Sequence, residues 1–171
     1  MRRDEQMTPQ VVLIMGVSGS GKTTIGLRLA DALGWSFCDG DVFHSPANLE
    51  KLRQGVPLTD EDRRPWLGTL RSALTEWIEQ GRHVVLACSA LKAAFRRALV
   101  EGLEDRLCVV YLKGDFDLIK QRLVHREGHF MHKDLLASQF EILEEPAEAL
   151  VIDVADSPDH IVARIRSALG R

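Results

Sequence analysis

The chain has 171 residues, a length that suits one domain and is short for two. Hydrophobic residues make up 45% of it and charged residues 27%, an ordinary globular composition that argues against intrinsic disorder. The 22 lysines and arginines against 25 aspartates and glutamates leave a net charge of −3. This balance excludes a strongly basic nucleic-acid-binding surface, although it permits a local cationic pocket.

The sequence also bears on where the protein resides. No apolar run reaches the roughly 18–20 residues that a membrane-spanning helix needs, and the charged start at 1–5 has no small-residue cleavage site. Cys38, Cys88 and Cys108 are odd in number, form no C-x-x-C pair and lie in or beside apolar runs. We therefore expect buried free thiols in a cytoplasmic protein that binds neither membranes nor nucleic acids.

Short β-rich runs alternate with amphipathic helical patterns, as in a parallel sheet covered by helices. Apolar runs predict five strands, at 11–15, 35–38, 84–88, 107–112 and 150–154. Helices are expected from about Gly21 to Gly34, after Thr59, after Asp115 and after Ser157. Pro65 is expected to start the long helix after Thr59 or to kink it. The pattern predicts one α/β domain over 1–171, with an N-terminal extension at about 1–9.

The segment after the first strand matches the phosphate-binding pattern G-x-x-x-x-G-K-[ST] in full, as Gly16-Val17-Ser18-Gly19-Ser20-Gly21-Lys22-Thr23. Its glycines let backbone N–H groups turn inward as an anion-binding nest at a helix N-terminus. Lys22 is expected to reach the β- and γ-phosphates of ATP, and the Thr23 hydroxyl to bind Mg²⁺. The predicted nucleotide-binding residues are Gly16, Ser18, Gly19, Ser20, Gly21, Lys22, Thr23, Thr24 and Arg122. Adenine contacts are expected near the turn at 155–157.

Two large classes of P-loop proteins do not fit. The guanine-reading Asn-Lys-x-Asp motif of GTPases is absent, and the strand at 84–88 does not end in the aspartate of large ATPases. Acidic residues follow the second strand instead, as Asp39-Gly40-Asp41, at the sheet edge where such folds bind ligands. One carboxylate could hold Mg²⁺ and the other accept a hydroxyl proton. A turn-forming D-G-D is the alternative for this pair alone.

A cationic segment follows the fourth strand. Arg122 and Arg126 are four residues apart and therefore share a helix face. The region at about 122–140 suits a small lid that excludes water and brings guanidinium groups to a transferred phosphoryl group. A solvated helix face is the alternative on spacing alone.

Further blocks stand along the chain. After the second strand it reads Gly40-Asp41, His44, Asn48, Lys51, Gly55 and Asp60-x-Asp62-Arg63-x-Pro65-Trp66-Leu67. Later come Cys88-Ser89-Ala90-Leu91-Lys92, Leu112-Lys113-Gly114-Asp115, Gly128-His129-Phe130-Met131 and Leu143-Glu144-Glu145-Pro146. These blocks resemble those of bacterial-type gluconate kinases from about Val11 to the C-terminal helix. The D-R-x-P-W and C-S-A-L-K blocks are the most specific.

This resemblance implies ATP-dependent phosphorylation of D-gluconate at its 6-hydroxyl. It also implies a P-loop fold like that of nucleoside monophosphate kinases, with a five-stranded parallel sheet, flanking helices and often a homodimer. Asp41 would be the base and Asp39 a residue of the Mg²⁺ shell. The chain departs from the family pattern at Arg97, where an acidic residue is expected after Phe95-Arg96.

Gluconate is a polyol with one carboxylate, so its pocket needs cations and hydrogen-bonding groups. The predicted substrate-binding residues are Asp41, His44, Lys51, Arg63, Ser89, Lys92, Arg96 and His129, with a surface role open for each. The predicted catalytic residues are Lys22, Asp41, Arg122 and Arg126, and the predicted Mg²⁺ ligands are Thr23 and Asp39. Gln139 could face the lid or lie on an exposed helix face.

Two other functions stay open at this point. The first is another small-metabolite kinase such as a shikimate kinase, against which Cys88-Ser89-Ala90 stands in place of that family's Gly-Gly-Gly run. The second is a nucleotide-binding module without catalysis, although the loop, the acid pair and the lid arginines are all present.

Overall fold

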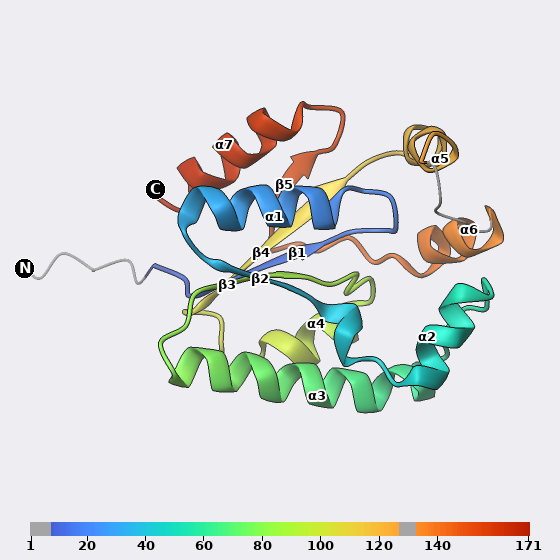
Figure 1. Ribbon diagram of the computed structural model, residues 1–171, viewed down its shortest axis with the longest axis horizontal. Coiled ribbons are helices and arrows are strands. Elements are labelled where there is room, and N and C mark those ends of the chain that lie inside the picture. The colour runs from blue at the N-terminus through green and yellow to red at the C-terminus, as the bar shows by residue number, and fades with distance from the viewer. Residues whose placement is uncertain (1–7, 127–132) are drawn as a thin grey trace, which may run out of the picture.

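Five parallel strands form the central layer of the protein (Figure 1). The computed structural model describes residues 8–126 and 133–171. The strands are β1 (Val11–Met15), β2 (Ser36–Asp39), β3 (Val84–Ala87), β4 (Leu107–Lys113) and β5 (Leu150–Asp153), in the order β2-β3-β1-β4-β5. The five predicted strands are confirmed to within one residue at each end.

Helices cover both faces of this sheet (Figure 1). They are α1 (Lys22–Leu33), the 3₁₀ helix η1 (Gly40–Phe43), α2 (Pro46–Arg53), α3 (Asp60–Glu79), α4 (Ala93–Val100), α5 (Phe116–Val124), α6 (Lys133–Ile142) and α7 (Pro158–Ala168). Helices α1 and α7 lie on one face, and α3 and α4 lie on the other. Among the described residues, no helix is both long and apolar enough to cross a membrane.

The core has one layer on each face of the sheet because side chains alternate along a strand. In β1, Val12 and Ile14 pack against α1 and α7, whereas Leu13 packs against Leu70 and Leu74 of α3. All five β1 residues are fully buried, as expected for a central strand of a parallel sheet. Cys88 is buried with them, whereas Cys38 and Cys108 are only half-buried, and all three thiols are free.

Side-chain caps determine where several helices begin. The Thr59 hydroxyl accepts a hydrogen bond from the Asp62 N–H at 3.1 Å, and the Asp62 carboxylate accepts one from the Thr59 N–H at 2.9 Å. This capping box starts α3 directly after Thr59, so Pro65 lies inside the helix. The prediction that Pro65 starts this helix is therefore wrong. Asp115 and Ser157 cap α5 and α7 as predicted.

The sequence pattern did not predict the short helices η1, α2 and α4. They have only 4, 8 and 8 residues, too few for a clear amphipathic period. Helix α2 lies with α5 and α6 beyond the carboxyl ends of the strands, on the right in Figure 1. Because all neighbouring strands are parallel, the loops that follow β1, β2 and β3 meet at this same edge.

Candidate active site

The loop between β1 and α1 forms a phosphate cradle. Gly16 approaches β4 so closely that a Cβ there would lie 2.9 Å from the Leu112 carbonyl oxygen, which only glycine avoids. The N-terminus of α1 has no side-chain cap, and its N-cap residue Gly21 has a φ of 99°. The first N–H groups of α1 are therefore available to an anion. Lys22 Nζ donates to the carbonyls of Gly16 and Val17 at 3.0 Å, which holds it over the loop.

Two carboxylates face this cradle from the end of β2. Asp39 caps η1 by accepting a hydrogen bond from the Asp41 N–H at 2.9 Å. Partial burial raises the pKa of Asp41 above its ordinary value, the Asp39 charge raises it further, and the Lys22 ammonium opposes both. Burial lowers the pKa of Lys22, and the charge of Asp41 opposes that effect. These three groups form one electrostatically coupled cluster, in which Asp41 is suited to accept a proton.

His44 packs behind Asp41. Its imidazole stacks on the Trp66 indole with ring centroids 4.3 Å apart, and Asn48 Nδ2 lies 3.4 Å from His44 Nδ1. Burial and then the charge of Arg63 lower the pKa of His44 to about 4, so the ring is neutral at pH 7. If Nδ1 accepts from Asn48, the proton is on Nε2, which lies 3.7 Å from Asp41 Oδ1.

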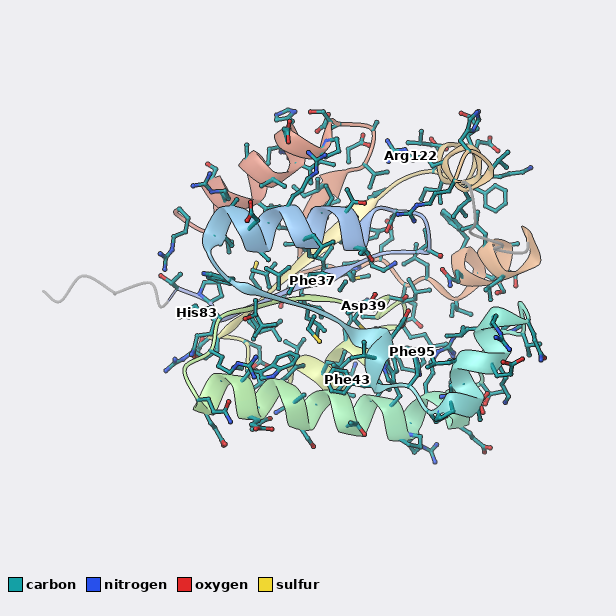
Figure 2. The ribbon with its side chains drawn as sticks, in the orientation of Figure 1. Phe37, Asp39, Phe43, His83, Phe95 and Arg122 are labelled. Carbon is teal, nitrogen blue, oxygen red and sulfur yellow. The ribbon has the colours of Figure 1, made fainter. Side chains whose placement is uncertain are left out.

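These groups line a pocket of about 310 Å³ at the carboxyl ends of β2 and β3. Its polar lining comprises Ser18, Lys22, Thr23, Asp39, Asp41, His44, Arg63, Ser89, Arg126 and Gln139. Its apolar lining includes Leu52, Leu58, Trp66, Phe95 and Leu135. Asp39, at the end of β2, and Phe95, in α4, both line this pocket and are labelled in Figure 2.

A second pocket, of about 220 Å³, lies along the other side of the phosphate cradle. Arg122, labelled in Figure 2, lines it, and its Nη2 donates to the Val154 carbonyl at 2.5 Å. Thr24 also lines this pocket, as does Asp156 in the turn at 155–157 where adenine contacts are predicted. Arg126 lines both pockets and therefore stands at their boundary.

The structure does not bring three of the predicted substrate-binding cations to the first pocket. Lys51 Nζ pairs with Asp62 at 2.9 Å, and Lys92 Nζ pairs with Asp60 at 2.8 Å. The guanidinium of Arg96 donates to three backbone carbonyls at 2.7–2.9 Å. These side chains fasten the segments around the pocket, so their predicted role in binding the substrate is not supported.

Arg63 does line the pocket. Its side chain is 17% exposed, its guanidinium carbon lies 5.4 Å from the Phe95 ring centroid, and its ion-pair partner Asp60 is 3.8 Å away. Burial lowers the pKa of Arg63, but a guanidinium stays charged at any physiological pH. Its fork of N–H donors therefore suits a carboxylate in the pocket.

The other predicted residues are Ser89, His129 and the Mg²⁺ ligands. Ser89, a predicted substrate-binding residue, lines the first pocket, whereas His129 lies outside the described residues. The chemistry of the donors fits MgATP, because Thr23 and Asp39 offer hard oxygen ligands beside a phosphate cradle. Among the described residues, no cluster of three or more His, Cys, Asp or Glu forms a metal site of protein ligands alone.

The sequence pattern does not predict the apolar lining of the first pocket, and it leaves two positions open for Gln139. Phe95 and Leu58 are single apolar residues in blocks otherwise read for their charges. Gln139 Oε1 accepts a hydrogen bond from the Ser18 N–H across 121 positions of sequence, and no local pattern signals such a contact.

Known proteins are similar to this chain in fold and in sequence. The family model described as shikimate kinase matches residues 18–169. A probable gluconokinase from Mus musculus is 46% identical over 94% of this chain and 98% of its own, and the thermoresistant gluconokinase from Escherichia coli (strain K12) is 41% identical over 90% and 89%. The crystal structure of a gluconokinase from Sinorhizobium meliloti 1021 superposes with a TM-score of 0.86 at 40% identity, over 96% of this chain and 93% of that one. The chain therefore belongs to the P-loop kinase family that the shikimate kinase model describes and, within it, to the gluconokinases.

Proposed function

We propose that the protein transfers the γ-phosphoryl group of ATP to the 6-hydroxyl of D-gluconate. One observation carries this proposal: a single pocket joins Lys22 of the phosphate cradle, the carboxylate of Asp41 and the half-buried guanidinium of Arg63. Phosphorylation of a sugar acid needs a phosphate site, a proton acceptor and a cation for the carboxylate, and these three residues supply them. The identity to gluconokinases over most of the chain supports gluconate as the acceptor.

In this mechanism the N–H groups at the start of α1 and Lys22 bind the β- and γ-phosphates. Thr23 and Asp39 are the residues that would hold Mg²⁺, which when bound neutralises charge on the phosphate oxygens. Asp41 orients the 6-hydroxyl and accepts its proton while the new O–P bond forms and the bond from phosphorus to ADP breaks. His44 stays neutral behind Asp41, so it adds no positive charge that would lower the basicity of that carboxylate.

Arg63, which lines the same pocket, binds the gluconate carboxylate. The apolar wall around it limits water, which strengthens the ion pair. Arg122 and Arg126 would neutralise the nucleotide phosphates from the other side, and arginines in this role are worth on the order of 10³–10⁵ in rate. Residues 127–132 of the predicted lid at about 122–140 lie outside the described ranges. The Mg²⁺ requirement and a cytoplasmic location are further parts of this proposal and rest on the sequence. A homodimer is also part of it and rests on the resemblance to gluconate kinases.

Acceptor specificity is the direct test. ADP release from MgATP should be strongly stimulated by gluconate, and not by shikimate, a neutral hexose or buffer alone. Asp41→Asn should lower kcat by about 10²–10⁴, because it removes the proton acceptor, and should leave ATP binding within a few-fold of wild type. Stimulation by another acceptor would reassign the substrate, and a near-normal kcat in Asp41→Asn would remove Asp41 as the base.

The protonation of Asp41 can be measured without turnover. A ¹³C NMR titration of the side-chain carboxyl groups in the nucleotide-free protein should give Asp41 a pKa above the ordinary value of about 3.9. Asp39→Asn should lower that pKa, because it removes a neighbouring negative charge but keeps an oxygen for the Asp41 N–H. Lys22→Met should raise it. An Asp41 pKa that neither substitution moves would contradict the coupled cluster.

The role of Arg63 has a matched control in its neighbour. Arg63→Met should raise the KM for gluconate about 10–100-fold with little change in the KM for ATP, since a charged hydrogen bond contributes about 1.5–3 kcal/mol. Arg64→Met removes an exposed arginine from the same helix, away from this pocket, and should behave as wild type. Equal effects of the two substitutions would show that Arg63 does not bind the carboxylate.

A further inference from the structure

Gln139 links helix α6 to the phosphate cradle. Its Oε1 accepts a hydrogen bond from the backbone N–H of Ser18 at 2.7 Å, and the side chain lines the first pocket. Because Ser18 contributes an N–H donor, the atom that faces it must be the amide oxygen. The orientation of the carboxamide is therefore fixed, with Nε2 directed away from the loop.

That nitrogen carries two N–H donors, and no hydrogen bond joins it to any residue in the described ranges 8–126 and 133–171. Gln139 is half-buried, so a donor without a protein partner there needs water or a ligand. The same pocket holds Asp41, the proposed base, and Lys22. The unused Nε2 donor therefore suits a ligand oxygen in this pocket that can accept a hydrogen bond.

Helix α6 is packed firmly enough to position this side chain. Leu136, one turn before Gln139, is 2% exposed and belongs to a buried cluster with Val17 of the cradle and Leu91. Just after α6, the Glu144 N–H donates to the Leu91 carbonyl at 2.9 Å, and the Arg96 guanidinium donates to the Glu144 carbonyl at 2.7 Å. These contacts fix the helix on both sides of Gln139, which limits the entropy lost when the side chain binds a ligand.

We propose that Gln139 is a specificity-determining residue for the acceptor. The Ser18 N–H holds its oxygen, and its Nε2 donates a hydrogen bond to a secondary hydroxyl of the polyol chain, between the carboxylate end and the reacting 6-hydroxyl. Because one side chain touches both the phosphate cradle and the acceptor, it aligns the acceptor with the phosphoryl group. This inference rests on the proposed function and adds to it a residue that recognises a hydroxyl group of the acceptor.

The test pairs a substitution with acceptors that lack single hydroxyl groups. Gln139→Met keeps the approximate length of the side chain and loses the carboxamide, so kcat/KM for gluconate should fall about 2–10-fold, the range of one neutral hydrogen bond. The acceptors are 2-, 3-, 4- and 5-deoxygluconate. For the wild-type protein, kcat/KM for one of these analogues should be lower than for gluconate by a similar factor. For Gln139→Met, kcat/KM for that analogue should be almost equal to that for gluconate. A merely structural role of Gln139 would lower activity equally for every analogue.

Two further variants complete the design. Glu141→Met changes an exposed residue of the same helix and should match wild type. Gln139→Asn keeps the carboxamide but is one methylene shorter, and should show the same selective loss if Gln139→Met does not fold. Equal losses over all analogues, unchanged gluconate kinetics, or a lower KM for ATP in Gln139→Met would overturn the inference. No gluconate phosphorylation by the wild-type protein would overturn the proposed function as well, so the two failures are distinguishable.

Discussion

The parallel pairing of β2 with β3 and of β3 with β1 brings the groups of the proposed active site together. In this register Asp39 lies opposite Ala87, and Ala87 lies opposite Ile14. The three strands therefore end at one level, and the chain leaves each of them toward the same pocket. The phosphate cradle follows β1, the two carboxylates follow β2 and Ser89 follows β3. An antiparallel pairing at either position would send one of these segments to the opposite edge of the sheet.

This edge concentrates charge that would be unfavourable elsewhere. Burial lowers the pKa of Lys22, and burial together with Asp39 raises the pKa of Asp41. Each pKa shift shows that the charged form of the group is less favourable here than in water. A ligand of opposite charge would therefore stabilise the charged form, and a proton would neutralise the carboxylate. In the proposed reaction a nucleotide phosphate would compensate the charge of Lys22, and a hydroxyl proton would neutralise Asp41. The proposed binding and proton transfer would therefore relieve the unfavourable charges of the site.

Much of this architecture was predictable because its signals are local. Five short apolar runs, the G-x-x-x-x-G-K-T loop and the Asp39-Gly40-Asp41 turn can each be recognised within a few residues. Pairing between charges is different. Lys51, Lys92 and Arg63 looked equivalent in the sequence, yet Asp62 and Asp60 hold the two lysines and leave the arginine at the pocket. The bond between Ser18 and Gln139 depends on the tertiary fold alone, and so no sequence pattern could reveal it.

The central claim is that the pocket places a primary hydroxyl of a sugar acid between Asp41 and the γ-phosphoryl group. Proton-coupled ³¹P NMR of the product formed from gluconate and MgATP tests it most directly. The account predicts a single phosphomonoester whose phosphorus couples to two methylene protons, formed in one equivalent with ADP. A phosphorus coupled to a single CH proton would contradict the account, because the phosphoryl group would then have reached a secondary hydroxyl. Release of inorganic phosphate alone would contradict it as well, because water would then be the acceptor.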